Sequence, residues 1–267
     1  MPRLQEVFGD PAPVALITGS GAPRVGRTIA EHLGQLGCRL ALHAHHSVAE
    51  AEETAARFRA QGVETIVVQG AMEASDEVES FVAAVIEHFG RLDILVNSAA
   101  IWEPKPLEEV TAAEVRRYLD INALGSFLAA QAAGLQMVEQ PHGGVIINLG
   151  DWALCRPYLD HAAYFPSKGA VEAMTRSLAV EFAERNRSIR VNCIQPGPVL
   201  LGDQVPHETV AAIAESVLLK RVGSPHEVAH AVQFLAENTF VTGVTLPVDG
   251  GRTIYANDPL QTGYRTG

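Results

Sequence analysis

Seven short apolar runs, rich in valine, isoleucine and leucine, alternate along the chain with longer segments of helical periodicity. Continuous apolar runs are typical of strands that are buried on both faces of a sheet. The predicted strands are Val14–Thr18, Arg39–His43, Glu64–Gln69, Leu92–Asn97, Gly144–Leu149, Ile189–Gln195 and Val244–Val248. The predicted helices are Arg27–Gln35, Ala49–Ala60, Asp76–Phe89, Ala113–Met137, Tyr164–Glu184, His207–Leu219 and Pro225–Leu235.

This alternation of strand and helix predicts an α/β fold, a doubly wound parallel sheet of about seven strands with helices on both faces. The 267 residues, 47% of them hydrophobic, are enough for one substantial core. We therefore expect one Rossmann-type domain over residues 1–267, with terminal tails at 1–11 and 253–267.

The composition narrows the class of protein. A net charge of −11 argues against nucleic acid or an anionic membrane as a partner, because both are bound through lysine and arginine. We find no apolar run near the roughly 20 residues that span a bilayer, and no signal-peptide pattern at the start. Cys38, Cys155 and Cys193 lie far apart, in no metal-ligand spacing. We expect a cytoplasmic protein.

A glycine-rich turn, Thr18 to Gly26, follows the first predicted strand and leads into a helix. Such a turn brings backbone N–H groups and the positive end of a helix dipole to a pyrophosphate. The turn alone is a moderate signal, because glycine-rich turns are common. Its place in a strand–turn–helix unit strengthens the interpretation as a dinucleotide site.

At this turn the chain resembles the short-chain dehydrogenase/reductase family, whose motif is T-G-x-x-x-G-x-G. Arg24 takes the place of the second glycine, and the turn is one residue longer. An arginine there is similar to the pteridine reductase branch, in which it faces the cofactor phosphates and the substrate. The resemblance implies cofactor contacts from Gly19, Arg24 and Val25. A surface arginine that caps the loop is the alternative.

The end of the second predicted strand bears on the choice between NADH and NADPH. His45, His46 and Ser47 stand where an acidic residue would bind a ribose 2′-hydroxyl, and no carboxylate occurs before Glu50. Imidazoles, a hydroxyl and a helix start can accept a 2′-phosphate. This favours NADP(H) and leaves NAD(H) open. A metal site is not expected, because successive strand residues point to opposite faces.

Two further segments match the family. Asn97-Ser98-Ala99-Ala100 stands where the family carries Asn-Asn-Ala-Gly, and the segment Arg190 to Gly197 matches R-V-N-x-[IV]-x-P-G. The resemblance therefore implies cofactor contacts from Asn97, Ala99, Pro196 and Gly197.

The candidate catalytic pair is Tyr164 and Lys168, four residues apart at the start of a long predicted helix. That spacing puts both side chains on one helix face. A phenol with a pKa near 10 needs a neighbouring ammonium to act as an acid near neutrality. Asn122 matches the family's helix asparagine, which supports a water relay to the lysine. A structural asparagine that bends the helix is the alternative.

Asp151 is the main departure from the family pattern, because it lies thirteen residues before Tyr164, where the family carries a serine. A serine hydroxyl donates to a substrate carbonyl, whereas an ionised aspartate only accepts hydrogen bonds. The site therefore suits a substrate with N–H donors, or a protonated aspartate that supplies a proton. Pteridine reductases carry aspartate here. A tolerated replacement in a degenerate enzyme is the alternative.

Trp102 follows the fourth predicted strand, in a segment similar to one in which pteridine reductases stack an aromatic ring on the pterin. Trp152 and Tyr158 are further candidates for the pocket wall. Offset stacking of a flat substrate on Trp102 would contribute on the order of 1 kcal/mol beyond the burial of area. The alternative is that Trp102 only covers the core.

We predict an NADPH-dependent oxidoreductase that transfers a hydride to a pterin-like C=N bond, with Trp102, Arg24, Asp151 and Tyr164 at the substrate. The same-fold alternative is a carbonyl reductase, such as a 3-oxoacyl thioester reductase. A non-catalytic nucleotide-binding sensor or scaffold is the alternative from another class. The resemblance also implies a homotetramer, formed through Gly169–Val180 and the segment from Phe240 to Gly251.

Overall fold

A parallel sheet of seven strands forms the centre of the computed structural model, which describes residues 3–202 and 204–256. The strand order is β3-β2-β1-β4-β5-β6-β7, and every neighbouring pair is parallel. The strands are β1 (Val14–Ile17), β2 (Arg39–Ala44), β3 (Thr65–Gln69), β4 (Ile94–Asn97), β5 (Gly144–Leu149), β6 (Ile189–Pro196) and β7 (Thr245–Val248). All seven predicted strands are confirmed, with ends that differ by at most two residues.

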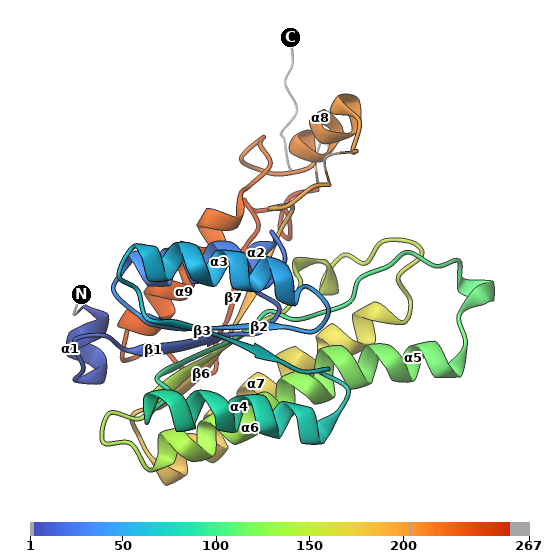
Figure 1. The fold of residues 1–267 in the computed structure, drawn as a ribbon. Helices are drawn as coiled ribbons and strands as arrows, with labels where there is room; N and C mark the ends of the chain where they lie inside the picture. Colours follow the sequence, from blue (N-terminus) through green and yellow to red (C-terminus); the bar gives the residue numbers. More distant parts are fainter. Residues whose placement is uncertain (1–2, 203, 257–267) are drawn as a thin grey trace.

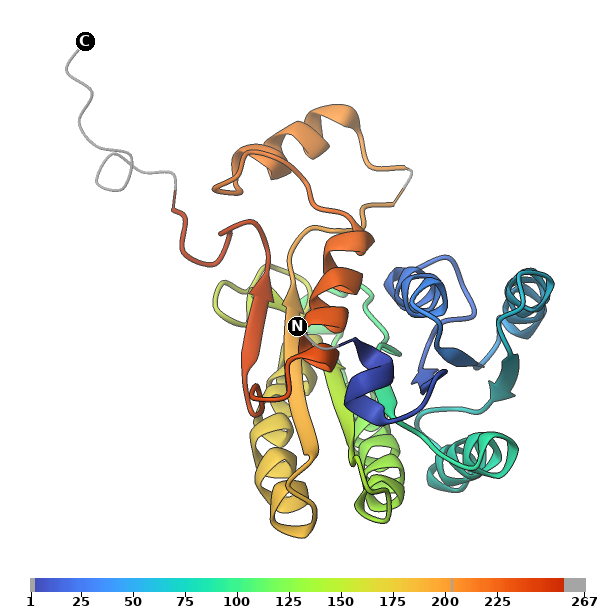
Figure 2. The ribbon, with the colours of Figure 1, turned by 90° about the vertical axis from the view of Figure 1, so that its left-hand side faces the viewer.

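Helices cover both faces of the sheet (Figure 1). The helices α2 (Val25–Gln35), α3 (Val48–Ala60) and α9 (Pro225–Glu237) form one layer. The opposite layer holds α4 (Ser75–Phe89), α6 (Gly125–Val138) and α7 (Tyr164–Arg185). The remaining helical elements are α1 (Leu4–Phe8), η1 (Leu107–Glu109), α5 (Ala112–Tyr118), η2 (Leu119–Leu124), η3 (Trp152–Leu154) and α8 (His207–Glu215). In both ribbon views α8 stands apart from the two layers (Figures 1 and 2).

The alternation of side chains along β1 divides the core in two. Ala15 and Ile17 point into the cluster beneath α2, α3 and α9, whereas Val14 and Leu16 point into the cluster beneath α4, α6 and α7. All four side chains are completely buried, so both faces of the strand need apolar residues. This double burial explains the uninterrupted apolar run in the sequence.

The order of strands reverses between β1 and β4. From β1 the chain proceeds outward to β2 and β3, then returns to β4 on the other side and proceeds to β7. In parallel sheets of this kind, ligands bind in the crevice at the carboxyl ends of the strands, where the order reverses. The Thr18 hydroxyl joins the two strand ends there, because it accepts from the N–H groups of Ser98 and Ala99, each at 3.0 Å.

The first predicted tail, residues 1–11, contains a packed helix instead. In α1, Leu4 and Phe8 are each only 1% exposed and belong to the core on the α9 side. Arg91 fixes the end of this segment through the Phe8 carbonyl at 2.8 Å and Asp10 at 2.9 Å. The prediction failed because Leu4, Val7 and Phe8, although at helical spacing, lie in a helix of only five residues, which is too short for a periodic pattern to stand out. Of the second predicted tail, residues 257–267 lie outside the described residues.

Two predicted helices differ from those in the structure. The helix predicted over His207–Leu219 ends at Glu215, and the next residues form turns. The helix predicted over Ala113–Met137 is a continuous helical segment, Ala112–Val138, in which η2 is a π-helical stretch between α5 and α6.

Ala112–Val138 is long and apolar enough to cross a membrane by length and composition, which the sequence analysis had not recognised. More than half of its most apolar window is buried inside the protein, at 56%. Its α6 part packs on β4, β5 and β6 and between α4 and α7. This packing explains the apolar composition as that of a core helix.

The burial of Phe8 predicts that α1 contributes to the stability of the domain. Phe8→Ala removes a fully buried ring, and we expect the free energy of unfolding to fall by about 3 to 5 kcal/mol. Urea denaturation followed by circular dichroism measures this loss. Leu107→Ala, at a side chain that is 70% exposed, is the control and should change little. An unaffected unfolding midpoint in Phe8→Ala would show that α1 does not pack on the domain in solution.

Candidate active site

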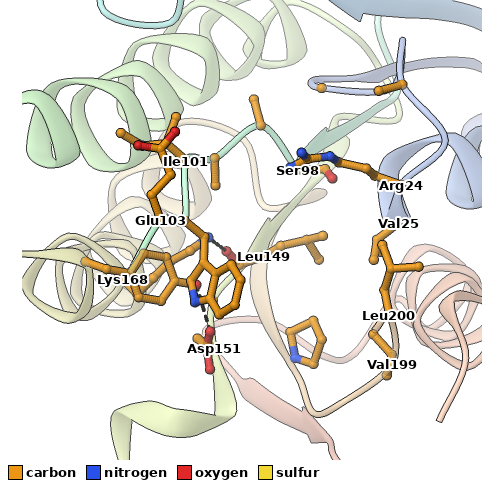
Figure 3. A pocket seen from close by; sticks show the side chains of 18 of the residues that line it. Arg24, Val25, Ser98, Ile101, Glu103, Leu149, Asp151, Lys168, Val199 and Leu200 are labelled. Atoms are coloured by element: carbon orange, nitrogen blue, oxygen red, sulfur yellow. Dashed lines mark hydrogen bonds between the residues drawn. The ribbon is translucent and has the colours of Figure 1, made fainter. Parts of the chain in front are cut away.

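A cavity of about 930 Å³ opens at the carboxyl ends of the strands (Figure 3). Figure 3 shows Arg24 and Val25 on one side of it and Asp151 and Lys168 on the other. The predicted site residues that line the cavity are Gly19, Arg24, Val25, His45, His46, Ser47, Ala99, Trp102, Asp151, Tyr164, Lys168, Pro196 and Gly197. Only Asn97 and Asn122 of the predicted set are absent from its wall.

The glycine-rich turn has the backbone shape that a close-fitting ligand needs. Gly19 has a φ of +67°, and a Cβ there would lie 2.8 Å from Cα of Ala99. At Gly21 a Cβ would lie 2.6 Å from Oγ of Ser47. Arg24 is the residue immediately before α2 begins. The turn therefore presents its backbone and the start of α2 to the cavity, as a pyrophosphate would require.

His43, which the sequence analysis did not select, fixes this turn to the sheet. Its Nδ1 accepts a hydrogen bond from the Gly19 N–H at 3.0 Å, and Nε2 donates to the Gly70 carbonyl at 2.9 Å. Burial, with a smaller contribution from the neighbouring His45, lowers the pKa of His43 to about 4, although the hydrogen bond to the Gly70 carbonyl acts in the opposite direction. The ring is therefore neutral near pH 7 and joins the turn after β1 to the ends of β2 and β3. In the sequence, the signal for this role is an ionisable residue within an otherwise apolar part of a predicted strand.

The end of β2 carries the candidate 2′ site. The rings of His45 and His46 stack with centroids 3.6 Å apart, and Ser47 immediately precedes α3. All three line the cavity, and none of them is acidic. Among the described residues, no group of three or more histidine, cysteine, aspartate or glutamate side chains is placed to hold a metal ion.

The Tyr164 hydroxyl donates a hydrogen bond to Oδ2 of Asp151 at 2.7 Å. The second carboxylate oxygen, Oδ1, accepts from the Ala153 N–H at 2.8 Å and so begins η3. Burial raises the pKa of Tyr164 well above its usual value of 10, and the charge and hydrogen bond of Asp151 raise it further. The sequence predicted that both residues would be in the site, but not that they would bind each other.

Lys168 lies one helical turn beyond Tyr164 and is also buried. Its Nζ donates to the Leu149 carbonyl at 2.7 Å and lies 5.9 Å from the centre of the Tyr164 ring (Figure 3). Burial lowers the pKa of Lys168, and the Asp151 carboxylate partly offsets this effect. The phenol therefore has an anion at its hydroxyl and a cation over its ring.

Asn122 lies behind the cavity wall, and its predicted support of a water relay to Lys168 stays a prediction. Its side chain exchanges two hydrogen bonds with the backbone of Ile101, at 2.9 and 3.1 Å, and donates to Oγ of Ser167 at 3.0 Å. The Ser167 hydroxyl in turn donates to the Tyr164 carbonyl at 2.6 Å. Because the amide is fully engaged in these contacts, Asn122 joins η2 to the start of α7 and does not line the cavity.

Asn97 likewise lies behind the cavity. Its Nδ2 donates to the Ser126 carbonyl at 3.0 Å and to Oδ1 of Asn148 at 2.9 Å. These contacts fix the carboxyl ends of β4 and β5 against α6. The predicted contact of Asn97 with the cofactor stays a prediction.

Aromatic side chains form the wall beside Tyr164. Trp102 is 53% exposed, so the alternative that it only covers the core is wrong. The indole stacks on His161, with centroids 4.7 Å apart, and its Nε1 donates to the Tyr158 hydroxyl at 2.7 Å. Trp152 and Tyr158 line the cavity as predicted. His161 was not predicted, because an isolated histidine in a loop carries no pattern.

The chain matches the family model described as Enoyl-(Acyl carrier protein) reductase over residues 22–253. The chain belongs to the short-chain dehydrogenase/reductase family. It is 31% identical over 248 residues to glucose 1-dehydrogenase 2 of Bacillus subtilis, covering 90% of this chain and 95% of that protein. It is 32% identical to the 3-oxoacyl-[acyl-carrier-protein] reductase FabG of Staphylococcus aureus, covering 89% and 96% of the two chains.

A solved structure agrees with these sequence relatives. A putative gluconate dehydrogenase from Agrobacterium tumefaciens superposes with a TM-score of 0.83 at 28% identity, covering 93% of this chain and 99% of that one. The protein is therefore an NAD(P)H-dependent short-chain oxidoreductase, and the scaffold alternative is set aside. None of these relatives is described as a pteridine reductase.

The hydrogen bond between Asp151 and Tyr164 predicts the direction of a pKa change. Asp151→Asn keeps an acceptor oxygen but removes the negative charge, so we expect the pKa of Tyr164 to fall. Burial remains, and it keeps that pKa above the value of a free tyrosine. An ultraviolet difference titration measures the change, with Tyr164→Phe in each background to isolate the signal. An unchanged or higher pKa in Asp151→Asn would contradict an ionised Asp151.

Proposed function

We propose that this protein is an NADPH-dependent reductase of a pterin-like C=N bond. The observation that carries the proposal is the carboxylate of Asp151 on the Tyr164 hydroxyl, 2.7 Å away inside the cavity. Each oxygen of an ionised carboxylate accepts more than one hydrogen bond. Asp151 therefore has acceptor capacity left for the N–H groups of a heterocyclic substrate, which a serine would not offer to the same extent.

The acidity of Tyr164 supports the same class of substrate. A phenol whose pKa is raised by burial and by a neighbouring carboxylate is a weaker acid than usual. A C=N nitrogen is a stronger base than a carbonyl oxygen, so it can take a proton from this weaker acid more readily. The charge of Asp151 therefore handicaps the reduction of simple ketones more than the reduction of imines.

The cofactor site fits a nicotinamide dinucleotide, because the turn at Gly19 and Gly21 has no room for side chains. Gly19, Arg24 and Val25 would hold the pyrophosphate, while Ala99, Pro196 and Gly197 line the path toward Tyr164. When bound, the nicotinamide supplies the hydride for the substrate carbon.

The protein's own residues handle the proton. Tyr164 donates its hydroxyl proton to the substrate nitrogen, and the phenolate left behind is stabilised by the Lys168 ammonium. Asp151 binds the substrate N–H groups, and Trp102 provides a face for the flat ring. Asn122 is a positioning residue, because it acts on Tyr164 through Ser167.

The alternative substrate class is a 3-oxoacyl thioester, which the name of the Staphylococcus aureus relative favours. The cavity is large enough for either class, and Tyr164 and Lys168 would serve both. The two functions differ in the role of Asp151. With a heterocycle, its carboxylate accepts hydrogen bonds from substrate N–H groups. With a thioester, its negative charge repels the carbonyl oxygen.

Homotetramer formation and a cytoplasmic location stay parts of the proposal. In α7, Val171 and Leu178 are buried within the chain, so they do not support an interface between subunits. Val180 at 72% and Phe240 at 99% exposure, in the two predicted interface segments, support one.

Substrate turnover tests the proposed function. With NADPH in excess, we expect kcat/KM for dihydrobiopterin or dihydrofolate to exceed that for acetoacetyl thioesters. Asp151→Ser should shift this ratio toward the thioester by about tenfold, the usual effect of one charged hydrogen bond. Tyr164→Phe, which should abolish both activities, is the control for contaminating reductases. Faster turnover of the thioester by the wild-type protein would overturn the pterin assignment.

The side chains after β2 predict the preference for cofactor. With the better substrate, we expect kcat/KM to be higher for NADPH than for NADH, because no carboxylate among His45, His46 and Ser47 repels a 2′-phosphate. Ser47→Asp introduces such a charge and should reverse the preference. A wild-type preference for NADH would contradict the prediction, whatever substrate is used.

A further inference from the structure

Arg252, which no motif selects, lies on the wall of the cavity two residues beyond Gly250. Its guanidinium lies over the ring of Trp152, with Cζ 4.4 Å from the ring centre. Trp152 follows Asp151 directly and also lines the cavity. The cation therefore lies on the cavity wall against Trp152, the residue that follows Asp151 in the sequence.

The Arg252 guanidinium has no carboxylate partner within ion-pair distance among residues 3–202 and 204–256. Asp249 is close enough to raise its pKa, but the Asp249 oxygens accept from the backbone N–H groups of Gly251 at 2.8 Å and Thr253 at 2.7 Å. Arg117, another cavity arginine, pairs with Glu103 at 3.5 Å. A half-buried guanidinium without a counter-ion has its donors available for an anion.

Tyr158 offers a second donor at the same end of the cavity. Its hydroxyl oxygen accepts from Nε1 of Trp102 at 2.7 Å, so its own proton points elsewhere. Burial raises the pKa of Tyr158 to about 12, with a further contribution from Asp151, while Arg252 lowers it. The hydroxyl therefore stays protonated near neutrality, and it interacts electrostatically with Arg252.

We propose that Arg252 and Tyr158 form an anion subsite that receives a carboxylate of the substrate. A guanidinium binds a carboxylate through two parallel hydrogen bonds, and the Tyr158 hydroxyl can donate a third. The chain carries a net charge of −11, and Asp151, Glu73 and Glu103 line the same cavity. Of the other cavity cations, Arg24 lies at the glycine-rich turn, Lys168 lies beside Tyr164, and Arg117 pairs with Glu103. Within the described part of the chain, Arg252 is therefore the cation left for an acidic group of the substrate.

The subsite deepens the proposed function and rests on it, because it assumes a heterocycle placed between Trp102 and Asp151. It narrows the substrate to a heterocycle that carries an acidic side group. The test is a pair of substrates that differ only in this charge: dihydrofolate and its dimethyl ester. The wild-type protein should have the lower KM for the free acid, and added salt should reduce the difference.

Arg252→Gln should raise KM for dihydrofolate about tenfold and leave KM for the ester nearly unchanged, with little effect on kcat for either. Arg252→Lys should keep part of the preference for the acid, because it keeps the charge but loses the planar fork. Arg185→Gln makes the same change of charge at an exposed arginine of α7 that pairs with Glu181, and should leave both KM values unchanged.

An equal rise in KM for the acid and for the ester in Arg252→Gln would overturn the subsite, because it would show that Arg252 only supports Trp152. Unchanged KM values would overturn it as well. If the wild-type protein reduces 3-oxoacyl thioesters and neither pterin, the proposed function fails instead. The comparison then uses a 3-oxo acid and its methyl ester, and an Arg252-dependent preference for the acid supports the subsite, whereas equal KM values overturn it.

Discussion

The hydroxyl of Thr18 connects the ends of β1 and β4, the two strands between which the strand order of the sheet reverses. It accepts from two successive backbone N–H groups, those of Ser98 and Ala99. Strands in a parallel sheet end together at one edge, where their last backbone groups lose partners within the sheet. The shape of the cavity therefore depends on which side chains form hydrogen bonds with these backbone groups. His43 does the same for Gly19 on one side, and Asn97 ties the ends of β4 and β5 on the other.

The other end of the cavity depends on charge. The Tyr164 phenol has the Asp151 carboxylate at its hydroxyl and the Lys168 ammonium over its ring, in a buried setting where electrostatic effects are stronger than in water. A serine in place of Asp151 would leave the lysine as the nearest charge and favour the phenolate. The aspartate reverses this balance and favours the protonated phenol. One substitution in a familiar motif therefore changes the acidity of Tyr164, while the fold that carries it stays the same.

The sequence was sufficient for the sheet because double burial leaves a strong local signal. Every residue of β1, β4 and β5 is buried, and apart from Asn97 and Asn148 these strands carry no polar side chain. The tyrosine and lysine were predictable because their spacing carries the chemistry. His43, His161 and Arg252 were not, since each acts through contacts with distant segments: Gly70, Trp102 and Trp152. Asn97 and Asn122 were predicted in the right region, but their side-chain partners are groups of the protein behind the cavity wall. A motif gives the position of a side chain in the chain, not the direction in which it points.

The π-helical stretch η2 lets one continuous helical segment serve two purposes. Its wider turn closes hydrogen bonds five residues apart instead of four, so it places one additional residue within the helix and changes the phase of everything that follows. Before it, Tyr118 contacts Glu103 and the Tyr164 ring; after it, Ala129, Ala133 and Met137 face the sheet. A regular α-helix would align only one of these two faces. The π-helical turn therefore shifts the helical phase between the part at Tyr118, which faces the active site, and α6, which packs in the core. Asn122 lies within this turn.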